Sequence, residues 1–204
     1  MKIEELENCP KWLKEADTAD ANVEIIDGVV HWYSGTWCTG VWKGGAWHGG
    51  NWDSGTWDEG TWHNGTWKGG YWRKGIWKTG IWNRGVWGNG QWEKGKWLDG
   101  HWYGGTWWEG TWKDGVWQNG IWYSGEWYNG IWDFGIWKKG SWSSGRWCNG
   151  FWATGNWLGG TWQRGTWWDG VWHGGTWSGG IWYRGKWIKG TWKGGWPTEL
   201  LLQL

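Results

Sequence analysis

Apolar and polar positions follow a strict period of five along most of this chain. Every fifth residue from Trp32 to Trp192 is tryptophan and every fifth residue from Gly35 to Gly195 is glycine, which makes 33 copies of the unit Trp-x-x-Gly-x. The residue before the tryptophan is Thr, Val or Ile in 20 of these 33 units, and such residues favour extended backbone. A short fixed period is typical of repeat architectures, in which units bury their apolar face by stacking.

The two positions between tryptophan and glycine predict a corner. The residue before the glycine is Gly eight times and Asn five times, with Ser and Asp also common. We expect these residues to adopt positive φ, as the second central position of a type II or I′ turn requires. An α-helix is excluded, because each glycine would cost about 1 kcal/mol relative to alanine and a period of five does not match 3.6. Each unit is therefore a short strand followed by a corner.

Charge pairing favours a solenoid over a meander of short hairpins. Neighbouring strands should place opposite charges side by side. Among equivalent positions one unit apart, three charged pairs have opposite signs and five have like signs, whereas the counts are eight and one at three units and eight and two at four units. The sequence thus predicts an all-β solenoid (β-helix) of about 33 units. A three-sided coil, a four-sided coil and the short-hairpin meander remain as alternatives at this point.

The unit Gly-[Thr/Val/Ile]-Trp-x-x resembles, in its period, the repeat of the pentapeptide-repeat family. Members of that family form four-sided right-handed β-helices with a large apolar residue at the centre of each side and a small residue two positions earlier. The resemblance implies that Trp takes the central site and Gly the small site, as a Trp/Gly-core variant, and it makes the four-sided coil our preferred prediction. MORN repeats also carry Gly-x-Trp-x-x-Gly, but in longer hairpin units whose remaining motif this chain lacks.

Three segments are expected. Residues 1–30 form an N-terminal cap, in which residues 1–22 are expected to be helical, with Pro10 opening the helix. A hairpin-like entry around Asp27-Gly28 is expected at residues 23–32. Residues 31–195 form the repeat array. Residues 196–204 form a C-terminal cap, in which Pro197 stops the pattern and three leucines follow. Such caps are expected because a stack of repeats has open ends.

Composition and charge argue against several functions. Twenty basic and nineteen acidic residues give a net charge of +1, which is typical of neither a DNA mimic nor a nucleic-acid binder. The acidic DNA mimicry of pentapeptide-repeat topoisomerase inhibitors is therefore not expected here. No secretory signal is visible, nor an apolar run long enough to cross a membrane. We expect no nucleic-acid or membrane partner, and a location in the cytoplasm or within a larger particle.

No constellation of residues predicts catalysis, a cofactor or a metal. The five histidines are scattered, and His48 and His63 would be neighbours only in a three-sided coil. The carboxylates Asp58 and Glu59 lack a cleft that would perturb them, and the three cysteines are far apart. We therefore expect a protein that is not an enzyme.

Outward aromatic residues are the strongest candidates for a function. Trp108, Trp168, Tyr123 and Tyr183 occupy positions that directly follow core tryptophans, and the pair Trp168 and Tyr183 lies twelve units after the pair Trp108 and Tyr123. Exposed aromatic rings anchor partners or stack on sugars. These four residues are predicted to bind a partner protein, a further copy of the chain or a glycan.

The sequence therefore predicts a non-enzymatic structural or interaction protein. It would be a rigid rod that presents a surface to a partner, as in a virion or another large assembly. The alternative is a carbohydrate-binding module that uses the outward aromatic rings.

Overall fold

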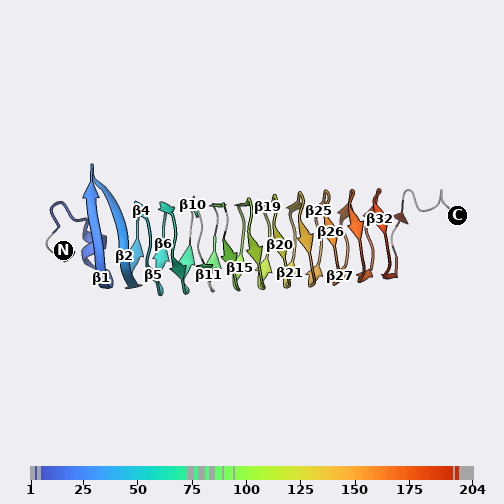
Figure 1. Ribbon diagram of the computed structural model, residues 1–204, viewed down its shortest axis with the longest axis horizontal. Coiled ribbons are helices and arrows are strands. Elements are labelled where there is room, and N and C mark those ends of the chain that lie inside the picture. The colour runs from blue at the N-terminus through green and yellow to red at the C-terminus, as the bar shows by residue number, and fades with distance from the viewer. Residues whose placement is uncertain are drawn as a thin grey trace.

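The chain forms a straight rod of stacked coils that runs from the N-terminus at one end to the C-terminus at the other (Figure 1). The computed structural model describes residues 3, 6–72, 76–77, 81–82, 86–88, 90–93, 95–194 and 196–197. It is an all-β parallel β-solenoid with very little helix, which confirms the predicted fold class. No described helix is long and apolar enough to cross a membrane.

The N-terminal segment covers the first coil with a hairpin and one turn of helix. Helix α1 spans only Lys11–Lys14, and β1 (Asp17–Ile26) pairs antiparallel with β2 (Val29–Thr39). Asp27 and Gly28 connect them with φ of 50° and 77°, the positive values that a type I′ turn requires. The expected helical segment was too long, because residues 17–19 and Asn22 already pair with β2. Most of the expected C-terminal cap, residues 198–204, lies outside the described residues.

The coil has three sides, and the preferred four-sided prediction was wrong. Each strand pairs in parallel with the strand three units later, so that Trp107 lies beside Trp122 and Thr106 beside Ile121. One coil is therefore three units long. In the interior, successive indoles meet edge to face with centroids 6.0 Å apart, as between Trp107 and Trp112. Three flat rings in this arrangement fill the coil. The preference for four sides came from the resemblance to pentapeptide repeats in period, which does not take the shape of the indole ring into account.

We call the three sides faces 1, 2 and 3. Face 1 contains the first part of β2 and then β4 (Ala46–Trp47), β7 (Thr61–Trp62), β10 (Ile76–Trp77), β13 (Gln91–Trp92), β16 (Thr106–Trp107), β19 (Ile121–Trp122), β22 (Ile136–Trp137), β25 (Phe151–Trp152), β28 (Thr166–Trp167), β31 (Ile181–Trp182) and β34 (Trp196–Pro197).

Face 2 contains the second part of β2 and then β5 (Asn51–Trp52), β8 (Thr66–Trp67), β11 (Ile81–Trp82), β14 (Lys96–Trp97), β17 (Thr111–Trp112), β20 (Glu126–Trp127), β23 (Ser141–Trp142), β26 (Asn156–Trp157), β29 (Val171–Trp172) and β32 (Lys186–Trp187). Because β2 runs through both faces, faces 1 and 2 form one 23-stranded sheet together with β1.

Face 3 is a separate 11-stranded sheet. It contains β3 (Val41–Trp42), β6 (Thr56–Trp57), β9 (Tyr71–Trp72), β12 (Val86–Trp87), β15 (His101–Trp102), β18 (Val116–Trp117), β21 (Ile131–Trp132), β24 (Arg146–Trp147), β27 (Thr161–Trp162), β30 (Thr176–Trp177) and β33 (Thr191–Trp192).

Stacked tryptophans form the core. Those from Trp32 to Trp177 have no exposed surface, and each ring lies almost parallel to the equivalent ring of the next coil, as with Trp107 and Trp122 at 4.7 Å and 6°. The backbone ladder runs alongside this stack: the Trp108 amide donates to the Trp92 carbonyl at 2.8 Å and the Thr106 amide to the Gly90 carbonyl at 2.9 Å. Burial of such aromatic area accounts for the rod's cohesion.

Hydrogen bonding of the core indoles is sparse. Nε1 of Trp162 donates to the Gly179 carbonyl and Nε1 of Trp167 to the Arg184 carbonyl, each at 3.1 Å. Most other described core indoles have no acceptor within hydrogen-bond distance of Nε1. Packing of ring faces and edges, and not hydrogen bonding, therefore supplies the core's stability.

The fixed glycines make the corners, which differs from the turn that the sequence suggested. Positive φ occurs at the fixed glycine itself, for example +137° at Gly110, and among the described array residues before it no side-chain-bearing residue has positive φ. Asp114 precedes Gly115 and its Oδ1 accepts the Gly115 amide hydrogen at 2.7 Å. Asn and Asp are thus favoured there because they bond to the corner backbone.

Candidate interaction surface

In the described units of the array, each strand presents two side chains to the outside, one before and one after its inward tryptophan. These side chains form columns that run along each face with a step of one coil, or three units. Charged partners follow the same step: Lys68 and Asp53 are 2.9 Å apart and Arg184 and Asp169 are 3.2 Å apart. The excess of opposite charges at three units in the sequence therefore reflects real neighbours.

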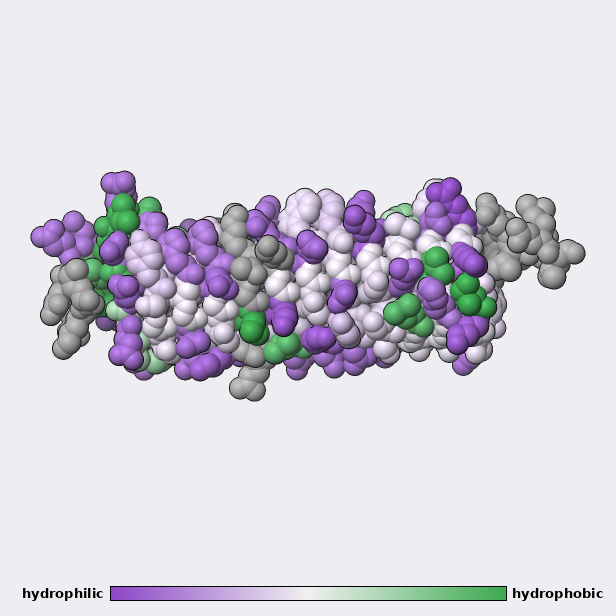
Figure 2. All heavy atoms as spheres, viewed as in Figure 1, coloured by the Kyte–Doolittle hydropathy of each residue, from purple (hydrophilic) through white to green (hydrophobic). Residues whose placement is uncertain are grey.

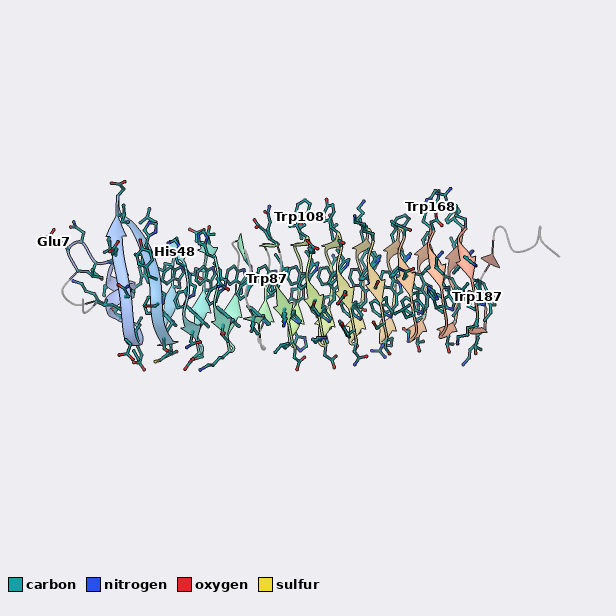
Figure 3. All side chains as sticks on the ribbon, viewed as in Figure 1. Glu7, His48, Trp87, Trp108, Trp168 and Trp187 are labelled. Atoms are coloured by element: carbon teal, nitrogen blue, oxygen red, sulfur yellow. The ribbon has the colours of Figure 1, made fainter. Side chains whose placement is uncertain are left out.

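The four predicted site residues lie in a single column of face 1. Trp108 and Tyr123 occupy adjacent coils, as do Trp168 and Tyr183, because the members of each pair are three units apart. The two pairs are four coils apart, not the three that a four-sided coil would give. Trp108 and Trp168 are 44% and 42% exposed and project from the same side of the rod, whereas Trp87 lies in its middle (Figure 3).

The paired rings contact each other closely. Trp108 stacks on Tyr123 with centroids 4.2 Å apart and planes 16° apart. Trp168 and Tyr183 are 4.9 Å apart but tilted by 47°, and the guanidinium of Arg184 lies 5.5 Å from the Trp168 ring. The Trp108 and Tyr123 rings therefore each have one face covered by the other.

A second column on face 1 was missed in the sequence. The residues before the tryptophans include Ile121, Ile136, Phe151 and Ile181, all at least partly exposed. With the aromatic column they make an apolar patch over six coils, here called the face 1 patch: Thr106, Trp108, Ile121, Tyr123, Ile136, Lys138, Phe151, Ala153, Thr166, Trp168, Ile181 and Tyr183. Reading every fifteenth residue would have revealed it.

The other two faces are more polar at the same levels. Face 2 presents Lys113, Glu126 and Lys186, and face 3 presents Asp133 and Arg146, whereas Lys138 is the one charged side chain of the face 1 patch. In Figure 2 polar groups dominate the visible side of the rod and apolar residues form small separate groups. A continuous exposed apolar patch marks an interaction site in proteins generally.

Two exposed aromatic residues outside face 1, Tyr128 and Tyr103, have local partners. Lys113 Nζ lies 3.3 Å from the centroid of the Tyr128 ring on face 2, and Tyr128 also donates a hydrogen bond to Glu126 at 3.1 Å. On face 3, Tyr103 stacks loosely on His101 at 6.5 Å. These contacts shield the strands and form no aromatic pair like those of face 1.

A histidine cluster occupies the N-terminal end of the same aromatic column. Tyr33, His48 and His63 stack in sequence at 4.9 and 4.8 Å, and His31 Nδ1 lies 3.0 Å from His48 Nε2. Burial lowers the pKa of His48, and the neighbouring His63 and His31 lower it further. Among the described residues no group of three or more His, Cys, Asp or Glu side chains is arranged to hold a metal ion.

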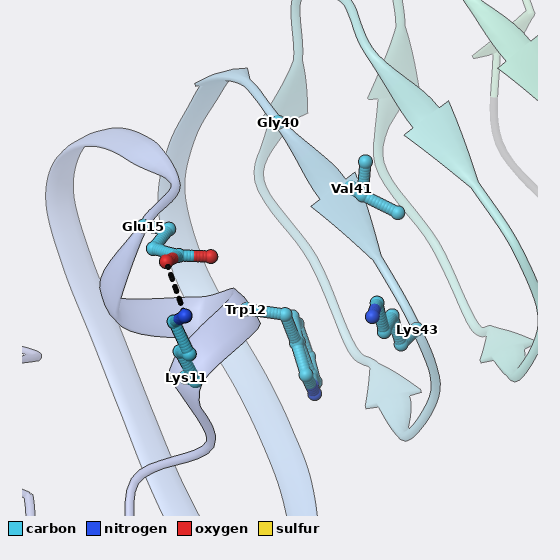
Figure 4. Close-up of a pocket in the computed structure, with 6 residues that line it drawn as sticks. All are labelled: Lys11, Trp12, Glu15, Gly40, Val41 and Lys43. Carbon is cyan, nitrogen blue, oxygen red and sulfur yellow. Dashed lines mark ion pairs between the residues drawn. The ribbon is translucent and has the colours of Figure 1, made fainter.

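A shallow hollow of about 470 Å³ lies between α1 and face 3 (Figure 4). Trp12 forms its wall and packs on Trp42 at 5.2 Å, while Lys43 stands at its rim and Lys11 pairs with Glu15 at 3.4 Å. Its lining contains no cysteine, serine, threonine or histidine. The hollow is a seam between the cap and the first coils, and Trp12 closes it.

Comparison with known proteins gives no relative. No protein-family model, no curated protein and no solved structure matches this chain. The argument for a function therefore rests on the face 1 patch and on the rod that carries it.

Proposed function

We propose that this chain is a non-enzymatic structural protein, a rigid rod that presents the face 1 patch to a protein partner. The observation that carries the proposal is the grouping of exposed apolar and aromatic side chains in two adjacent columns over six coils. Leaving such a surface in water has no structural benefit, since the core is complete without it. Burial against a partner would recover about 25 cal/mol for each Å².

The rod suits this role because its shape is fixed by the backbone. Every described coil is hydrogen-bonded to the coils on either side, and the tryptophan stack continues through them. Side chains on face 1 are therefore held at a constant spacing of about 4.8 Å along the axis. A partner that binds several coils meets a preorganised surface, which reduces the entropy lost on binding. A virion or another large assembly is the setting that such a spacer suits best.

A carbohydrate partner is the second candidate. Sugars stack on the open face of an aromatic ring, and Tyr183, at 38% exposed, offers more of its ring than the half-buried Tyr123. The flanking column of isoleucines and Phe151 offers few hydrogen-bond partners for sugar hydroxyls, so a protein partner is favoured. The chain shares only the five-residue period with pentapeptide repeats, so no function of that family is carried over.

Two matched double variants test the proposal. Trp108→Lys/Trp168→Lys changes face 1, whereas Leu158→Lys/Ile188→Lys changes face 2 at two side chains of similar exposure, 47% each. Sedimentation of the tagged chain from extracts of its source cells reports the size of its native assembly. We expect the face 1 variant to sediment as a smaller species and the face 2 variant to match wild type. Equal behaviour of the two variants would contradict the proposal.

A further inference from the structure

We infer that the face 1 patch binds a second copy of this chain, with the two rods parallel and their coils in register. This inference rests on the proposed function and names the partner. The two-fold axis would run along the rod, above the tryptophan column of face 1. Each strand of face 1 then places the residue before its tryptophan opposite the residue after the same tryptophan in the second copy.

The sizes of the facing side chains are complementary at three of the six levels of the face 1 patch under this symmetry. At one level Trp108 faces Thr106 of the second copy, and three coils later Phe151 faces Ala153. The bulky residue follows the core tryptophan at the first level, as Trp108 does, and precedes it at the later level, as Phe151 does. The level of Trp168 repeats the level of Trp108. At these three levels a large side chain meets a small one, and at the other three an isoleucine meets Tyr123, Lys138 or Tyr183. Such facing columns allow two sheets to pack at about 10 Å.

Charges at the margins also agree with a parallel pair. The two-fold axis also brings corners of the two copies together. The corner that precedes a face 1 strand in one copy lies opposite the corner that follows the equivalent strand in the other copy. Asp169 then faces Arg164 of the second copy, and Lys139 faces the exposed Phe134. Lys138 faces Ile136, along which its aliphatic stem can pack while its ammonium group stays in water. Like charges are not brought together at any described level from Thr106 to Arg184.

The area argues for a contact along the whole rod. Eleven coils of about 4.8 Å and a face about 12 Å wide give about 640 Å² on each copy, or about 1,300 Å² in total. That total lies within the range of stable protein interfaces, whereas the six coils of the face 1 patch alone would give about 700 Å² and fall below it. The histidine end would then be the polar rim and the face 1 patch the apolar core.

Sedimentation equilibrium of the purified full-length chain gives the first test. We expect a reversible dimer at micromolar concentration. Ile136→Lys should weaken it at least tenfold, because the new ammonium group faces Lys138 of the second copy. Ile136→Glu should weaken it much less, because the carboxylate faces that same lysine. Leu158→Lys on face 2 is the control and should leave the dimer unchanged.

Cross-linking tests the parallel register directly. In a background in which Cys9, Cys38 and Cys148 are replaced by serine, Phe151→Cys and Ala153→Cys chains are prepared separately. A short bismaleimide should link the mixture of the two chains efficiently and each chain alone poorly. Efficient linking of Phe151→Cys to itself would indicate an antiparallel pair and overturn the inference.

Failure of the inference is distinguishable from failure of the proposed function. A chain that stays monomeric up to high concentration overturns the second copy as partner. If the Trp108→Lys/Trp168→Lys variant still loses its native assembly in extracts, the proposed function stands with a different partner. If substitutions on face 1 change neither the dimer of the purified chain nor the assembly in extracts, both the inference and the proposed function are wrong. Far-ultraviolet circular dichroism of every variant confirms that the rod is intact.

Discussion

At the scale of single residues, the fixed glycines are needed for the backbone as well as for the room they leave to tryptophan. The resemblance to pentapeptide repeats placed the fixed glycines at a small site, and a Cβ added at Gly110 would indeed lie 3.2 Å from the Trp107 ring. In the structure the φ of Gly110 is +137° and a Cβ added there would lie 2.5 Å from the Gly95 carbonyl oxygen of the preceding coil. Both the backbone conformation and the contact between coils exclude a side chain.

Gly110→Ala should therefore destabilise the rod by about 1–3 kcal/mol. Gly104 is the matched control, since its φ is not in the left-handed region and an added Cβ would meet nothing closer than 4.0 Å. Gly104→Ala should be neutral or stabilise by about 0.4–1 kcal/mol through the unfolded chain. Urea unfolding followed by circular dichroism measures both. Equal effects at the two positions would show that the corner has been misinterpreted.

A central tryptophan should be among the costliest residues to lose. Trp112 has no exposed surface and stacks between Trp97 and Trp127 at 4.8 Å on each side. Trp112→Ala removes those contacts and leaves a cavity, so we expect a loss of about 3–5 kcal/mol of unfolding free energy. Trp108→Ala, which changes an exposed ring, should cost far less. A comparable cost for the two substitutions in urea unfolding would contradict the inward assignment.

His48 makes part of the stability depend on pH. Its pKa is lowered in the folded chain by burial and by His63 and His31, so the unfolded chain binds the proton more readily. Stability is therefore full above the ordinary histidine pKa of about 6.5 and falls as the pH decreases through the lowered folded value. His48→Gln should reduce this loss of Tm between neutral and mildly acidic pH. An unchanged pH profile would show that His48 does not contribute to it.

At the scale of elements, the sequence predicted the strand and the corner of each unit but not how units neighbour each other. The β-branched residues before most of the tryptophans and the period of five predicted the strands, and the excess of opposite charges at three and four units favoured the solenoid. Charge pairing did not distinguish three sides from four, because the number of oppositely charged pairs is the same at three units as at four units. The number of sides is decided by how three indole rings meet edge to face inside the coil. The spacing of apolar and charged residues along the sequence does not show this ring packing.

The candidate site could be predicted only in part, because its residues come together only through the three-unit coil. Trp108 and Tyr123 were identified as outward residues because they follow core tryptophans. Their direct stacking, and the neighbouring column with Ile136 and Phe151, follow only once the three-unit coil is known. The N-terminal hairpin shows the opposite case: Asp27-Gly28 marks a turn by local chemistry alone, whereas the extent of the preceding helix was decided by pairing between β1 and β2.

At the scale of the whole molecule, the number of sides determines the length of the rod and the placement of every surface column. Three units per coil give about eleven coils and a length of about 53 Å, whereas four would give about eight coils and about 40 Å. The grouping of Trp108 with Tyr123, and of Trp168 with Tyr183, in one column of face 1 exists only with three sides. The proposed interaction surface therefore depends on the three-unit coil.

Disulfide trapping tests that coil most directly. Thr111 and Glu126 are register partners on neighbouring strands of face 2, about 4.8 Å apart along the axis, a spacing that a disulfide can bridge. Thr111→Cys/Glu126→Cys should therefore oxidise readily within the folded monomer, as measured by peptide mass spectrometry. Thr111→Cys/Ile131→Cys, four units apart and on different faces, should not. Efficient oxidation of the second pair and not the first would contradict the three-sided rod and the interaction surface built on it.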